Sequence, residues 1–264
     1  MAANQDTRSM ALFCDFENVA LGVREAKYAQ FDMDKVLERL LLKGSIVVKK
    51  AYCDWERYKD FKSTMHAAAF ELIEIPHLRQ SGKNSADIRM VVDALDLCYT
   101  KGHVDTFVIV SGDSDFSPLV SKLRENAKTV IGVGVKNSSS DLLIANCDEF
   151  IFYDDLVRED EHKRLAAKKR KVSAPASGDK GGDKQNEAFD LILETLHALI
   201  AERGEGERIW GSMVKQALKR RNPGFNESYY GFRAFSDLLE EAEKRGLIKL
   251  EPDEKSGGYL IRPT

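Results

Sequence analysis

The sequence predicts an α/β fold, a parallel sheet flanked by helices, which is followed by a flexible linker and a small α+β domain of winged-helix type. Three observations predict this architecture. Short apolar runs alternate with amphipathic stretches over residues 1–157, the composition becomes charged and polar over 158–187, and helical patterns return over 188–264. The 264 residues suffice for one medium and one small domain.

Six short apolar runs predict the strands of the sheet. Most of them are apolar at consecutive positions, which indicates strands buried on both faces. The runs are MALFC (10–14), SIVVKKAYC (45–53), ELIEIP (71–76), DTFVIVS (105–111), KTVIGVGV (128–135) and EFIFY (149–153).

Stretches with helical spacing of apolar residues separate these runs and predict the covering helices. Because strands that alternate with helices are joined by right-handed crossovers, the sheet is expected to be parallel. The predicted helices span residues 31–44, 56–70, 85–100 and 116–126.

Residues 158–187 hold nine basic and six acidic residues and the segment SAPASGDKGGDK, which is typical of flexible linkers. We interpret KKRK at 168–171 first as a solvated charge run, with phosphate contact or a nuclear address as alternatives. Beyond the linker, helical patterns over 189–204, 210–225 and 231–246 precede two short apolar runs. This order predicts three helices and a β-wing.

Composition limits the classes of function. The formal net charge of −3 excludes a uniformly basic surface, although local basic patches stay compatible with nucleic-acid binding. The four cysteines are widely spaced and form no metal-ligand motif, which indicates a reduced, cytoplasmic protein. No apolar stretch is long enough to span a bilayer, so no membrane partner is expected.

Polar residues follow the first and fourth predicted strands, at the end of a parallel sheet where ligands bind. Asp15 and Asn18 come after the first strand, and Asp113 and Asp115 after the fourth. Asp87 begins the third predicted helix on its buried stripe, where an acid needs an opposite charge, a metal or several hydrogen-bond donors. The alternatives are a turn residue for Asp15, a helix cap for Asp113 and an ordinary first-turn acid for Asp87.

Two other acids of the third predicted helix are left out of the site. Asp93 and Asp96 share the outer helix face with Arg89, which precedes Asp93 by four residues. A solvated ion pair is the expected role of this group.

Four carboxylates held within a few ångströms cannot all stay ionised without a cation. Oxygen ligands select Mg²⁺ or Mn²⁺ over zinc, and such ions assist phosphodiester hydrolysis by activating water and neutralising the leaving oxygen. Phosphate contacts are expected from side chains near this cleft, although the serines could instead cap a following helix. The expected contacts are Lys83, Ser111, Ser138 and Ser139.

The motifs FCDFENV, GKNSADIRMVVDAL and VSGDSDFSPLV occur in this order within residues 8–157. They resemble the NYN domain, a branch of the PIN-like nucleases that includes the LabA-like proteins. The resemblance implies a PIN-like Rossmannoid sheet and a metal-dependent endoribonuclease. It places the family's acidic metal site on Asp15, Asp87, Asp113 and Asp115, and the family's asparagine on Asn18.

Residues 188–264 resemble the OST-HTH domain, also called LOTUS, which is linked to RNA binding. Independently of this resemblance, basic residues beside aromatic residues suit the binding of single-stranded or structured nucleic acid through phosphate contacts and base stacking. The alternative is a core position for the aromatics, which we expect for Phe232 and Phe235. The predicted RNA contacts are Lys215, Lys219, Arg220, Arg221 and Tyr230.

These observations predict a metal-dependent ribonuclease with a tethered RNA-binding domain. The main alternative is a non-catalytic RNA-binding adaptor that keeps the acidic site. A phosphatase is disfavoured because Glu17 stands where its second aspartate is expected, and GVGV at 132–135 lacks the third glycine of a dinucleotide fingerprint. The sequence does not distinguish RNA from DNA, since phosphate contacts are shared, and a homodimer is compatible with it.

Overall fold

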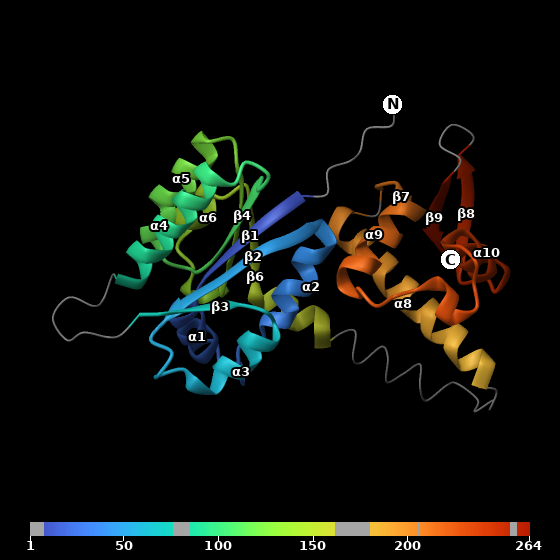
Figure 1. The fold of residues 1–264 in the computed structure, drawn as a ribbon, viewed down its shortest axis with the longest axis horizontal. Coiled ribbons are helices and arrows are strands. Elements are labelled where there is room, and N and C mark those ends of the chain that lie inside the picture. The colour runs from blue at the N-terminus through green and yellow to red at the C-terminus, as the bar shows by residue number, and fades with distance from the viewer. Residues whose placement is uncertain (1–7, 76–84, 162–179, 205, 254–257) are drawn as a thin grey trace. The chain divides into compact units, whose positions relative to one another are not determined.

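The computed structural model describes residues 8–75, 85–161, 180–204, 206–253 and 258–264 (Figure 1). The chain divides into two compact units. The first is made mainly of Thr7–Leu40 and Ser45–Lys171, and the second mainly of Val172–Thr264. Each unit has its own sheet and its own hydrophobic core.

The first unit contains a six-stranded parallel sheet in the order β3-β2-β1-β4-β5-β6. All six predicted strands are confirmed. Their bounds are β1 (Arg8–Asp15), β2 (Gly44–Cys53), β3 (Glu71–Glu74), β4 (Thr106–Val110), β5 (Thr129–Gly134) and β6 (Glu149–Phe152). The strand order reverses between β1 and β4, so the crevice at their carboxyl ends is the expected ligand site.

Helices cover both faces of this sheet (Figure 1). Alternate residues of β1 face opposite layers: Leu12 and Cys14 belong to one core cluster, and Ala11 and Phe13 to the other. The first layer holds α1 (Phe16–Glu25), α2 (Met33–Lys43) and α3 (Lys59–Ala67). The second holds α4 (Ser85–Thr100), α5 (Ser117–Glu125) and α6 (Asp141–Asn146).

The four helices predicted for this unit are present with slightly narrower bounds, except that α4 matches its prediction. Helix α1 was not predicted, because it follows β1 without a connecting loop. Its apolar residues Phe16, Val19 and Val23 are spaced like a helix face and are buried. Because no turn residue separates the strand from the helix, this helical spacing did not stand out as a separate element of the sequence.

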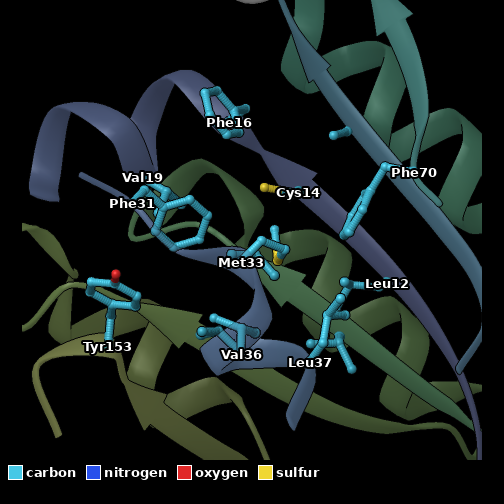
Figure 2. Packing of buried hydrophobic residues seen from close by; sticks show 14 of the residues in the cluster. Leu12, Cys14, Phe16, Val19, Phe31, Met33, Val36, Leu37, Phe70 and Tyr153 are labelled. Carbon is cyan, nitrogen blue, oxygen red and sulfur yellow. The ribbon is translucent and has the colours of Figure 1, made fainter. Parts of the chain in front are cut away.

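Phe16 anchors the start of α1 in the core. Its ring is fully buried and lies 5.0 Å, centroid to centroid, from the rings of Trp55 and Phe61, and 6.1 Å from that of Phe31. Figure 2 shows Phe16 and Phe31 on the same side of β1 as Cys14. Because Asp15 immediately precedes Phe16, this packing also fixes the position of the Asp15 backbone.

The second unit has the expected winged-helix elements. Its helices are α8 (Lys180–Arg203), α9 (Gly211–Arg221) and α10 (Phe235–Lys244), and its sheet has the order β7-β9-β8 with antiparallel pairing. Strand β7 (Ile209–Trp210) was not predicted, because two residues carry no periodic pattern, whereas β8 (Ile248–Asp253) and β9 (Gly258–Pro263) form the predicted hairpin. Phe232 and Phe235 are buried, as predicted.

The predicted linker over 158–187 is helical at both ends. Residues 153–161 are helical, and α8 begins at Lys180. Charged and polar residues such as Lys, Glu and Gln are good helix formers, so a polar composition does not by itself exclude a helix. Residues 162–179, with KKRK, lie outside the described residues, and the predicted domain boundaries stay predictions.

We predict that Phe16→Ala lowers the free energy of unfolding by about 3–5 kcal/mol, because it removes a fully buried ring from an aromatic cluster. Chemical denaturation of the variant measures this change. Val47→Ala is the matched control on β2, since Val47 is 49% exposed, and its effect is expected to stay within about 0.5 kcal/mol. Equal losses for both variants would contradict the anchoring role of Phe16.

Candidate active site

The carboxyl ends of β1 and β4 bring Asp15 beside the loop that follows Val110. Cys14 pairs with Val110 in the sheet, so Asp15 and Ser111 leave it side by side. Ser111 Oγ donates to Asp15 Oδ2 at 3.1 Å and accepts from the amide of Asp113 at 3.2 Å. The Ser111 hydroxyl therefore connects Asp15 to the loop that carries Asp113.

Asn18 makes a second tie between the same two segments. The backbone N–H of Asn18 donates to Asp15 Oδ1 at 3.3 Å, and the side-chain Oδ1 of Asn18 accepts from the backbone N–H of Gly112 at 2.9 Å. Gly112 also lets the backbone of Ser138 approach closely, because a Cβ at Gly112 would lie 2.3 Å from the carbonyl oxygen of Ser138. The Asn18 side chain, predicted as catalytic, thus holds the Gly112 amide, and Asn18 reaches Asp15 only through its backbone.

Burial and mutual repulsion raise the pKa values of two of the acids. Asp15 is 7% exposed, and its pKa is about 7, first because of burial and then because of the negative charges of Asp87 and Asp113. The pKa of Asp87 is about 6, again first through burial, then through Asp113, Asp115 and Glu17. The structure therefore brings all four predicted acids to one end of the sheet.

Asp113 and Asp115 belong to a short helical turn, η1 (Ser114–Phe116). Asp113 is its N-cap and accepts from the amide of Asp115 at 3.0 Å, so the capping alternative also holds. Asp115 is exposed. Glu17, which was given no site role, adds its charge to the field on Asp87 and pairs with Arg57 at 3.1 Å. The position of Glu17, two residues after the end of β1, is the sequence signal that could have assigned it to the site.

Asp93 is more enclosed than predicted. Its ion pair with Arg89 is present at 3.1 Å, but the Asp93 side chain is only 13% exposed and also accepts from the hydroxyl of Tyr52 at 2.9 Å. The expectation of a solvated pair is therefore wrong for Asp93, because β2 supplies a buried partner that local spacing does not reveal. Asp96 is exposed.

The donor set fits a hard divalent cation in its chemistry, since Asp15, Asp87 and Asp113 offer only carboxylate oxygens. Without a cation, burial and repulsion hold two of these acids near neutral pKa. In the part of the chain that the structure describes, no three Asp, Glu, His or Cys side chains are arranged as a ready-made metal site. Mg²⁺ in proteins usually keeps several water ligands and binds through one or two carboxylates, so this donor set fits such an ion.

The predicted RNA contacts of the first unit are only partly accessible. Ser111 is fully buried, so the prediction that it contacts RNA is wrong, and its role is to position Asp15. Ser138 and Ser139 are half-buried and donate to the carbonyl of Val135 at 3.4 and 2.8 Å. The helix cap falls instead on Ser140, which precedes α6. Lys83 lies outside the described residues.

In the second unit, the basic residues of α9 that were predicted to contact RNA differ in how far their side chains are exposed. Arg221 is 9% exposed in its side chain and pairs with Glu194 of α8 at 2.7 Å, so helix packing replaces its predicted RNA contact. Lys215 pairs with Glu227 at 2.9 Å but keeps 40% of its side chain exposed. Lys219 and Arg220 lie on the last turn of α9.

The exposed aromatic of this unit is Tyr229, the neighbour of the predicted Tyr230. Tyr230 is half-buried and stacks on Phe225 at 5.3 Å between ring centroids. Tyr229 is 60% exposed, and Lys184 Nζ lies 4.6 Å from its ring centroid. Sequence reasoning could not separate the two adjacent tyrosines, because only packing decides which ring is covered.

The acidic cluster at the switch point of a parallel sheet, in one chain with a winged-helix module, agrees with the PIN-like nuclease domain and RNA-binding domain that the sequence resemblance implies. The chain belongs to the NYN domain family, whose pattern matches residues 9–154. Residues 190–249 match the OST-HTH/LOTUS domain. Both resemblances seen in the sequence are thereby confirmed.

Two related proteins carry no assigned activity. The chain is 28% identical over 145 residues to the uncharacterised protein MJ0482 of Methanocaldococcus jannaschii. The matched stretch covers 55% of this chain and 57% of that protein. It is also similar to the crystal structure of VPA0982 from Vibrio parahaemolyticus, a protein of unknown function. There the identity is 28% and the TM-score 0.51, over 58% of this chain and 96% of the other.

None of the described helices combines the length and apolar character that a bilayer crossing needs.

We predict that Asp15 makes the metal-free protein less stable as the pH rises. Its folded-state pKa of about 7 exceeds the ordinary 3.8, so the folded protein keeps a proton in this window that the unfolded chain releases. Stability is therefore lost between these pH values. Asp15→Asn, measured by denaturation in EDTA, should gain up to about 4 kcal/mol relative to wild type between about pH 4 and pH 8.

The control for this prediction is Asp96→Asn, an exposed acid on α4. Its stability should stay within about 0.5 kcal/mol of wild type. A stability difference for Asp15→Asn that does not change with pH would contradict a raised pKa of Asp15.

Proposed function

We propose that the chain is a metal-dependent endoribonuclease that uses Mg²⁺ or Mn²⁺, with the OST-HTH domain holding RNA near the site. The observation that supports it most is the meeting of Asp15, Asp87, Asp113 and Asp115 at the carboxyl ends of β1 and β4. The family matches agree with a nuclease-type domain and an RNA-binding domain. Tethering raises the local RNA concentration.

The chain's own residues prepare the carboxylates for this role. Asp15, Asp87 and Asp113 would hold the ion, with the exposed Asp115 at the rim. A bound ion lowers the pKa of water and offsets charge on the phosphate. Both oxygens of Asp15 already accept hydrogen bonds, from Ser111 and from the Asn18 amide, which limits rotation of this carboxylate.

A non-catalytic RNA-binding adaptor is the second candidate. Like the nuclease, it would keep the acidic metal site, so metal binding does not distinguish the two. The two candidates differ in whether RNA is cut. Binding of DNA, a homodimer and a cytoplasmic location stay predictions.

We predict that Asp87→Asn lowers kcat/KM for RNA cleavage by at least about 100-fold, because one oxygen ligand becomes neutral. Labelled single-stranded RNA, structured RNA and DNA are incubated with Mg²⁺, Mn²⁺ or EDTA. Asp96→Asn is the matched control on the outer face of the same helix and should stay within about twofold of wild type. RNA binding by wild type without cleavage under every condition would favour the adaptor.

We predict that Tyr229→Ala raises the Kd for single-stranded RNA about tenfold, because an exposed ring beside Lys184 can stack on a base. The turnover number at saturating RNA should not change, since Tyr229 lies in the other unit. Fluorescence anisotropy and single-turnover cleavage measure the two quantities. Tyr99→Ala, which removes a tyrosine that is 65% exposed on α4, is the control, and an equal loss of affinity there would contradict a specific role of Tyr229.

A further inference from the structure

A groove of about 700 Å³ lies between α4, η1, α5 and α6 in the first unit. Asp87 and Asp115 are among its lining residues, so it shares two acids with the candidate active site. The groove is therefore continuous with the place where the phosphate would be cut.

The walls of the groove are unusually apolar for an exposed surface. Ile88, Val92 and Leu142 are 62%, 55% and 58% exposed, and all three line it. The lining also includes the hydroxyl side chains of Ser114, Ser117 and Ser121, but no Lys or Arg among the residues that the structure describes. Such walls suit a flat, uncharged group that forms hydrogen bonds, and they do not suit a phosphate.

Ser117 gives independent support for a ligand. It is 6% exposed and lines the groove, and its Oγ is buried with no hydrogen-bond partner among the described residues. A buried hydroxyl without a partner costs free energy that a bound ligand could recover.

We infer that this groove binds an unpaired base of the RNA, in the nucleotide next to the phosphate held at the acidic cluster. The inference rests on the proposed function and adds a substrate class to it. The aliphatic side chains contact the faces of the base, and hydroxyl groups such as that of Ser117 contact its edge. A base inside a duplex is stacked and paired, so the groove selects single-stranded RNA at the cleavage position.

The test is photocrosslinking of the full chain to a short single-stranded RNA that contains one photoreactive thiouridine. Ca²⁺ is present to offset the charge of the carboxylates, and mass spectrometry maps the crosslinked peptides. We expect crosslinks within α4 and α5, lowered at least about fivefold by Val92→Asp, which places a negative charge in the groove. Tyr99→Asp, on the same helix but outside the groove lining, should leave them unchanged.

Ser117→Ala provides a second variant that does not risk the fold, because it removes a hydroxyl without a partner among the described residues. Its melting temperature should be equal to or above that of wild type, while the groove crosslinks decrease. The same RNA annealed to its complement should give no groove crosslinks.

Three results would overturn the inference: crosslinks confined to the OST-HTH domain, equal crosslinking of the duplex, or equal losses in the Val92 and Tyr99 variants. Self-association that Val92→Asp abolishes, without groove crosslinks, would assign this face to a second copy of the chain. Groove crosslinks without cleavage would reject only the nuclease proposal, and cleavage without groove crosslinks would reject only the groove.

Discussion

Burial of carboxylates that also repel one another, at the carboxyl ends of β1 and β4, is the constraint on which the first unit depends. Asp15 is held in a buried position, where its own desolvation and the charges of Asp87 and Asp113 oppose ionisation. The free-energy cost of ionising these acids is largest in the absence of a cation, and acids with such raised pKa values cluster at functional sites. The packing and hydrogen bonds around Asp15 therefore have to offset the free-energy cost of burying its carboxylate.

The fold does so with neutral groups from three neighbouring segments. Phe16 fixes the start of α1 in an aromatic cluster, Ser111 supplies a buried hydroxyl, and Asn18 joins α1 to the amide of Gly112. None of these contacts brings a positive charge to the acids, so their negative charge stays available for the cation of the proposed function. The same geometry leaves the apolar groove beside Asp87 and Asp115 open, where it can take the uncharged part of a nucleotide.

The basic and aromatic residues of the second unit have different roles, which a list of basic residues does not reveal. Arg221 is used for packing α9 on α8, whereas Lys215 stays 40% exposed although it pairs with Glu227. Tyr229, beside Lys184, offers the free aromatic face of the module. Charge and aromatic content alone therefore overestimate the RNA-binding surface, because some of these side chains are needed for the core.

The sequence by itself determined the six strands, the parallel sheet, the three helices and wing of the second unit, and the convergence of the four acids. Periodicity and strand-end position are local signals, and the topology of parallel sheets carries strand-end residues to one edge. Strand β7, the burial of Ser111 and the enclosure of Asp93 by Tyr52 were decided only by tertiary structure. Each depends on a partner distant in sequence, and the choice between Tyr229 and Tyr230 depends on which ring the core covers, which no local pattern encodes.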